Sequence, residues 1–194
     1  MLSPVGGCAI SAERAHGTFK GATMSRVLKL LVLVAIAGLS SAVALPAQAQ
    51  DEDVAALAAA LKETKLTLQE GIKAAEREGQ PISAQFEIDD GKLRLSIYTN
   101  KGEDFTEVIT DPTSGAIVTA EKIIDSDDLS DAADQKAAME KATVSLLAAA
   151  VTAEKENPGS RAVGIFPDLR DGHAVAEVTL LLGESAKKVT EKLD

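Results

Sequence analysis

The dipeptide Asp90-Gly91 lies between two runs of alternating apolar and polar residues, and it constrains the fold of this chain more than any other feature. A type I′ turn requires positive φ at both central residues, so Asp-Gly in this setting predicts a β-hairpin with a two-residue loop. Counting outward gives the apolar pairs Ile88 with Leu93, Phe86 with Leu95 and Ala84 with Ile97. The other face receives Asp89 with Lys92, Glu87 with Arg94, Gln85 with Ser96 and Ser83 with Tyr98. We expect the apolar face to be buried and the polar face to meet solvent.

A capped helix is predicted directly before this hairpin. Thr67 and Glu70 have the spacing of a capping box, in which each side chain accepts a hydrogen bond from the backbone N–H of the other residue. Apolar residues follow at helical spacing at positions 68, 72 and 75, and Gly79 and Pro81 end the helix. After the hairpin, the sequence predicts a turn at Gly102, a strand over residues 105–111, and a turn over 111–115 that leads to a short apolar run.

These motifs together resemble the PepSY domain over residues 66–118. The matching pattern is Thr67-x-x-Glu70-x-Ile72-x-x-Ala75, a hairpin, and then Asp111 followed by Ser114-Gly115-x-Ile117. Gly71 stands where the family has alanine, which by helix propensity alone costs about 1 kcal/mol. PepSY domains occur in propeptides of secreted metallopeptidases and in other exported proteins, where an inhibitory or regulatory role toward peptidases has been proposed. The resemblance therefore implies a non-catalytic regulatory role.

The same plan returns in weaker form toward the end of the chain. Asp171-Gly172 matches Asp90-Gly91, and Gly183 matches Gly102. Ser145 stands in the place of Thr67, but Ala148 replaces Glu70, so we expect no capping box and one unbroken helix from about Asp131 to Glu156. The second copy stops at Asp194, near the equivalent of Asp111, so its closing turn and last short strand are expected to be absent.

The expected fold class is α+β, with two tandem units that each consist of a helix packed on a small antiparallel sheet. The first unit covers residues 50–124 and includes an alanine-rich amphipathic helix near residues 51–63, with Val54, Leu57 and Leu61 on one face. We expect that helix to pack on its own domain, the alternative being a partner-binding arm. Residues 125–130 are expected to be an acidic linker that ends in the N-cap Ser130, and residues 131–194 the degenerate second unit.

Residues 1–49 are predicted to be an upstream extension and a secretory signal peptide. Positive charges at Arg26 and Lys29 precede an apolar run over residues 30–43 that is shorter than the roughly 20 residues needed to span a bilayer. Small residues at positions 47 and 49 predict cleavage between Ala49 and Gln50. We expect translation to start at Met24, and the mature protein to be periplasmic or secreted without inserting in a membrane.

Charge and cysteine content exclude several classes of function. Cleavage after Ala49 takes away four of the 20 basic side chains and one of the 30 acidic ones, which leaves a net charge of −13. So acidic a chain repels the phosphates of nucleic acids and anionic lipids. The sole cysteine, Cys8, lies in the removed segment and has no signal sequence before it, so neither a disulfide nor lipidation is expected.

The sequence carries no pattern for catalysis or for a cofactor. His173 is the one histidine beyond the signal segment, and its place beside the Asp171-Gly172 turn suits a solvated residue better than a general base. The acidic cluster from Asp125 to Asp134 lacks the ligands of an EF-hand, because the fifth, sixth and twelfth positions hold Leu129, Ser130 and Lys136. We therefore expect no enzyme and no cofactor, and leave weak cation binding at the cluster open.

A possible protein-contact surface follows from the second hairpin. A strict two-residue register places Phe166, Val175 and Leu181 outward beside Ala162, with Val163 inward, where the first hairpin has a polar face. An apolar patch of this kind predicts contact with a protein partner in the cell envelope, in keeping with a peptidase modulator. The alternatives are that the patch is covered within the chain, that Pro167 shifts the register, or that the protein is a structural or sensory accessory subunit.

Overall fold

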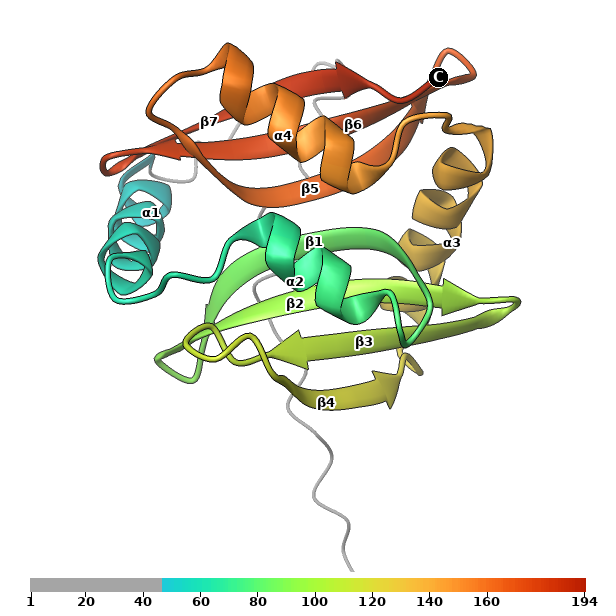
Figure 1. Cartoon of the computed structure of the whole chain (residues 1–194), viewed down its shortest axis with the longest axis horizontal. Coiled ribbons are helices and arrows are strands. Elements are labelled where there is room, and N and C mark those ends of the chain that lie inside the picture. The colour runs from blue at the N-terminus through green and yellow to red at the C-terminus, as the bar shows by residue number, and fades with distance from the viewer. Residues whose placement is uncertain (1–46) are drawn as a thin grey trace, which may run out of the picture. The chain divides into compact units, whose positions relative to one another are not determined.

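The computed structural model describes residues 47–194, which form four helices and seven strands (Figure 1). The predicted extension and the hydrophobic part of the signal peptide lie outside these residues. The helices are α1 (Ala47–Leu61), α2 (Leu68–Ala75), α3 (Ser126–Lys141) and α4 (Leu146–Glu156). The strands are β1 (Gln80–Asp89), β2 (Lys92–Lys101), β3 (Asp104–Thr110), β4 (Ile117–Lys122), β5 (Arg161–Arg170), β6 (His173–Leu182) and β7 (Ser185–Lys192).

The predicted α+β class is confirmed, but the sheet is larger than expected. All seven strands form one antiparallel sheet in the order β4-β3-β2-β1-β5-β6-β7, where we expected two small sheets. The two halves join where β1 pairs with β5, Ala84 opposite Ile165 and Gln85 opposite Gly164. This pairing supplies backbone partners to two strands that would otherwise be sheet edges.

Both hairpins have the predicted two-residue turns. Asp90 and Gly91 have φ of 48° and 73°, and Asp171 and Gly172 have φ of 53° and 83°. All seven predicted pairs of the first hairpin, from Asp89 with Lys92 to Ser83 with Tyr98, are present. The second hairpin keeps a strict register through Pro167, which pairs with Ala176.

A β-bulge near the start of each hairpin corrects part of the predicted pattern. The register shifts between Pro81 and Ser83 in β1, and between Ala162 and Gly164 in β5. Because the bulge adds a residue, Ala162 pairs with Leu180 and both are fully buried, so the outward placement of Ala162 was wrong. A shift in register was considered at Pro167, but it occurs instead at Val163, the bulge residue.

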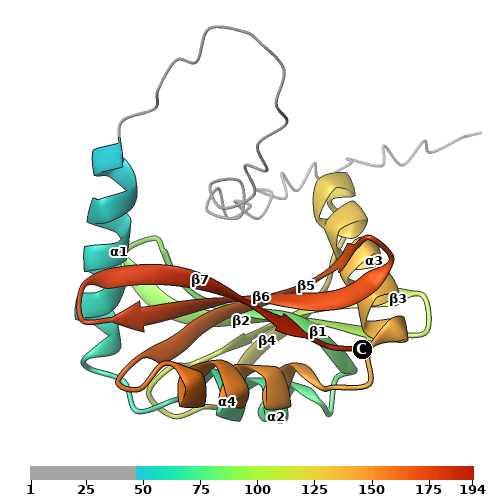
Figure 2. The same cartoon turned by 90° about the horizontal axis from the view of Figure 1, so that it is seen from above.

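Helices α2 and α4 lie side by side on one face of the sheet, while α1 and α3 stand at its two ends on the opposite side (Figure 2). Apolar side chains from both halves meet under α2 and α4 in one continuous core; its fully buried members include Leu68, Ile82, Leu95, Ile97, Ile165, Val178 and Leu180. Among the described residues, no helix is both long and apolar enough to cross a membrane.

The segment between the halves is helical, which corrects two predictions. Residues 125–130 are the N-cap and first turn of α3 rather than a linker, because Asp125 and not Ser130 caps the helix by accepting from the N–H groups of Asp127 and Asp128. The predicted helix from 131 to 156 is interrupted after Lys141. The N–H groups of Thr143 and Val144 both donate to the carbonyl of Leu193, a tertiary partner that no local pattern reveals.

The helix caps follow the sequence closely. Thr67 caps α2 with both hydrogen bonds of the capping box, as predicted. Ser145 caps α4 by accepting from the N–H of Ala148 at 3.2 Å, and without a glutamate at that position the reciprocal bond is missing.

Candidate functional site

The sheet surface opposite α2 and α4, here called the α1/α3 face, carries polar side chains from both halves of the chain. They alternate with core residues along the strands, so each strand presents every second side chain to this face. Its members are Gln85, Glu87, Asp89, Arg94, Ser96, Tyr98 and Glu107 in the first half and Phe166, Asp168, Val175, Glu177, Thr179, Leu181 and Lys188 in the second.

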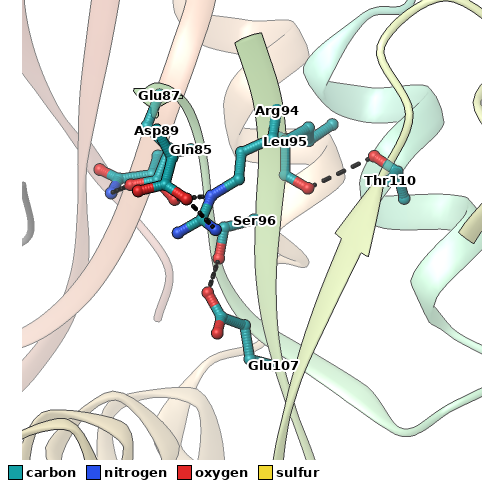
Figure 3. A network of polar contacts seen from close by, with 8 residues as sticks. All are labelled: Gln85, Glu87, Asp89, Arg94, Leu95, Ser96, Glu107 and Thr110. Atoms are coloured by element: carbon teal, nitrogen blue, oxygen red, sulfur yellow. Dashed lines mark hydrogen bonds and ion pairs between the residues drawn. The ribbon is translucent and has the colours of Figure 1, made fainter. Parts of the chain in front are cut away.

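In the first half, the polar groups form a hydrogen-bonded network (Figure 3). The Nε of Arg94 lies 2.6 Å from Oε1 of Glu87, and its Nη1 lies 2.8 Å from Oδ2 of Asp89. Gln85 donates to the other oxygen of Glu87, and the hydroxyl of Ser96 donates to Glu107 at 2.7 Å. The predicted Glu87–Arg94 pair is confirmed, but the side chain of Glu87 is 4% exposed, so the prediction that this face meets solvent was wrong at its centre.

The electrostatics of this network follow from partial burial. Burial opposes the charged form of Arg94, yet the carboxylates of Glu87 and Asp89 outweigh it and raise the pKa of the guanidinium. Burial, together with the nearby carboxylates of Glu107 and Asp128, raises the pKa of the Tyr98 hydroxyl far above its ordinary value. Tyr98 therefore stays a neutral hydroxyl at any physiological pH.

Helix α3 brings further carboxylates to the same end of the sheet. The pKa of Asp128 is raised, mainly by burial and to a smaller extent by the negative charges of neighbours such as Asp125 and Glu107. Burial and the charge of Asp134 do the same for Asp131. No group of three or more metal-ligating side chains was found among the described residues.

The second half of the α1/α3 face has its own charged cluster. Glu177 lies 2.6 Å from Nζ of Lys188 and 3.7 Å from Nη2 of Arg170. The ring of Phe166 lies against Gly164, where an added Cβ would come within 3.4 Å of it. The turn at Gly183 sets the pairing of β6 with β7 and so places Lys188 opposite Thr179. This turn could therefore have predicted, from the sequence, that Lys188 lies close to Glu177.

The three predicted contact residues do not form an exposed patch. All lie on the α1/α3 face, but Val175 is 9% and Leu181 7% exposed, and only Phe166 is half-buried. Helix α3 packs against β5 and β6, and α1 packs against β7. In the second half of the α1/α3 face, the apolar surface left to a partner is thus centred on Phe166, with charged groups beside it.

The remaining predicted residues lie elsewhere. Nδ1 of His173 is 2.7 Å from Oδ2 of Asp194, and this hydrogen bond is the main cause of the lowered pKa of that carboxyl. Ala49 and Gln50, the predicted cleavage site, lie in the first turn of α1. A shallow groove on the other side of the sheet is lined by parts of α2, α3 and α4, among them Ile72, Met139 and Leu147.

Comparison with known proteins adds little. No protein-family model and no curated protein matches this chain. Among solved structures, one described as a "putative lipoprotein" from Clostridium difficile 630 is similar over 63% of this chain and 80% of its own, with 14% identity and a TM-score of 0.38. A likeness of this extent carries no functional inference.

Proposed function

We propose that this protein is a non-catalytic, exported binding module, similar to PepSY domains, whose α1/α3 face holds a protein partner in the cell envelope. The partner proposed is a peptidase whose activity the module restrains or modulates. The observation that carries the proposal is that charged side chains from both halves are already fixed by ion pairs, Arg94 to Asp89 in one half and Glu177 to Lys188 in the other. Groups held in place before association lose less entropy when a partner binds.

A duplicated architecture supports this proposal. Each half has a first helix at one end of the sheet, a second helix on its core face, and then three strands in succession, to which the first half adds β4. Residues 81 positions apart take equivalent places, as Asp90 and Asp171 or Gly102 and Gly183 do. Ala84 and Ile165 are separated by the same 81 positions and pair with each other, so an approximate two-fold axis passes between them. We infer that two tandem copies of one unit each contribute half of the binding face.

Site-specific photo-crosslinking in the native envelope tests the proposal. A photoreactive amino acid at position 166 or 168 lies on the α1/α3 face, and one at the exposed Lys73 of α2 serves as the control. The proposal expects a discrete crosslinked protein from positions 166 and 168 and none from 73. Equal crosslinking at all three positions, or none at any, would contradict it.

The peptidase role has a separate test. We expect Phe166→Asp to leave folding cooperative and to abolish capture, whereas Val118→Asp on the exposed strand β4 changes neither. The captured protein is then assayed for peptide hydrolysis with and without the purified module. A change in turnover supports a modulator of a peptidase, while a partner without peptidase activity assigns the module to the structural or sensory accessory class. Unfolding of Phe166→Asp would mean that this surface is core.

A further inference from the structure

Strand β7 forms one edge of the sheet, and its outer backbone groups are regularly spaced. The N–H of Leu193 donates to the carbonyl of Ala174, which fixes that pair as a hydrogen-bonded one. In an antiparallel ladder the bonded pairs recur at every second residue, so Val189 and Glu191 bond toward β6 while Ala186 and Thr190 direct their backbone groups outward. No other described strand pairs with β7 on this outer side.

The first half of the chain shows what such an edge can accept. Strand β3 has the same place in the first half as β7 has in the second, because each begins two residues after the equivalent glycine, Gly102 or Gly183. The outer edge of β3 is filled by β4, and the N–H of Ile123 donates to the carbonyl of Phe105 at 3.0 Å. With the same 81-residue offset, Phe105 corresponds to Ala186 and Ile109 to Thr190. The backbone positions that bind β4 in the first half are therefore the ones that face outward in β7.

The charge of β7 indicates the chemistry of a strand that would fit. Its eight residues carry three lysines, Lys187, Lys188 and Lys192, on a chain whose net charge is −10. Lysines on an edge strand discourage pairing with a second copy of the same strand, because like charges would meet. The same lysines favour a strand with carboxylates opposite them.

We propose that β7 accepts an extended acidic segment of a partner protein as an eighth, antiparallel strand, in the register that β4 takes on β3. In that register β4 places Thr119 opposite Ile109 and Glu121 opposite Glu107. On β7 the equivalent partner residues lie opposite Thr190 and Lys188, so a glutamate at the second position meets a lysine instead of a like charge. Main-chain hydrogen bonds supply affinity and the lysines supply selectivity. The β7 edge borders the α1/α3 face, because Lys188, which pairs with Glu177 on that face, also lies opposite the added strand. The main-chain pairing with β7 does not depend on whether the α1/α3 face binds a partner.

A peptide copied from the chain itself is a suitable probe. It has the sequence of residues 116–123 with Lys122→Glu, which puts carboxylates opposite Lys187 and Lys188. We expect it to bind the full chain and to shift the amide resonances of residues 185–192. The same peptide with lysine at both acidic positions should bind roughly tenfold more weakly. Shifts confined to β4 or to the helices would overturn the proposal.

N-methylation of the peptide backbone distinguishes strand addition from simple charge attraction. Methylation at the position of Glu121 removes an N–H that bonds to β7 and should weaken binding roughly tenfold. Methylation at the position of Ala120, whose N–H points away from β7, should leave binding unchanged. Equal effects at both positions would show that the peptide does not bind as a strand.

A variant of the protein completes the test. Thr190→Pro deletes one outward N–H of β7 without removing a bond to β6, a position that an edge strand tolerates. It should weaken the acidic peptide roughly tenfold while the thermal unfolding midpoint stays close to that of the parent. If the variant unfolds, the N-methylated peptides decide the question on the parent protein. Undiminished binding by a folded Thr190→Pro would contradict the proposal.

Discussion

At the scale of single residues, Gly71 shows how packing can reverse a propensity argument. By propensity alone, Gly71→Ala would stabilise α2 by about 1 kcal/mol. An alanine Cβ at this position would, however, lie 2.1 Å from Cδ2 of Leu95, a fully buried core side chain. We expect Gly71→Ala to destabilise the protein by about 1–3 kcal/mol through overpacking. Denaturant unfolding measures the change in the free energy of unfolding. Adding Leu95→Val to Gly71→Ala should restore part of the lost stability. A Gly71→Ala variant more stable than the parent would contradict the overpacking argument.

The Glu87–Arg94 pair is the second test at this scale. An exposed cross-strand pair contributes roughly 0.2–1 kcal/mol. Here Glu87 is 4% and Arg94 22% exposed, and removal of one member leaves a buried charge without its counter-ion. Arg94→Met should therefore cost on the order of 3 kcal/mol, and Glu87→Gln combined with Arg94→Met much less than the sum of the single changes. Additive costs in a double-mutant cycle would mean that the pair is not formed.

At the scale of elements, the two helix caps should differ in strength. Thr67→Ala removes the bond that the Thr67 hydroxyl accepts from the N–H of Glu70 and the bond it donates to the Glu70 carboxylate, whereas Ser145→Ala removes one bond. We expect Thr67→Ala to cost about 1 kcal/mol and Ser145→Ala less, each read from the shift of the denaturation midpoint. A larger loss at Ser145 would indicate that the cap of α4 has contacts beyond the helix itself.

Helix α3 makes stability depend on pH. Burial and neighbouring carboxylates raise the pKa of Asp128 in the folded state, so the folded protein binds more protons than the unfolded one between the ordinary and the raised value. In that window stability falls as pH rises, and the ionised group opposes folding at neutral pH. Asp128→Asn should stabilise the protein at pH 7, with the gain vanishing below about pH 4, where the carboxyl is protonated in both states.

Thermal unfolding across pH measures the effect, with Asp53→Asn on the exposed part of α1 as the control. A stabilisation by Asp128→Asn that persists unchanged at low pH would instead point to a change in helix propensity or capping.

Local chemistry predicted the elements whose partners are near in sequence. The α2 cap and the predicted pairs of the first hairpin depend on residues three to fifteen positions apart and were found as expected. The break between α3 and α4 depends on the carbonyl of Leu193, about 50 residues away, and the bulge at Val163 has no local signal. For the same reason the face of Phe166, Val175 and Leu181 was predicted, while the choice between exposure and coverage within the chain stayed open, and the structure shows Val175 and Leu181 buried.

At the scale of the whole molecule, the joining of two halves into one sheet was not foreseeable. The hairpin patterns show which side chains are buried but not which strand lies at an edge, because both edges of a strand offer the same backbone groups. The pairing of β1 with β5 decides this, and it turns two half-faces into one α1/α3 face. The proposed binding surface exists as a unit only if that pairing forms.

The β1–β5 junction is therefore the most direct point to measure. In solution NMR spectra of the protein, we predict cross-strand nuclear Overhauser effects between Ala84 and Ile165 and between Gln85 and Gly164. The same spectra should show slow amide exchange on both strands, as expected for the centre of a sheet. Absence of these contacts, with β1 and β5 exchanging rapidly as two open edges, would contradict the single sheet and the continuous binding face built on it.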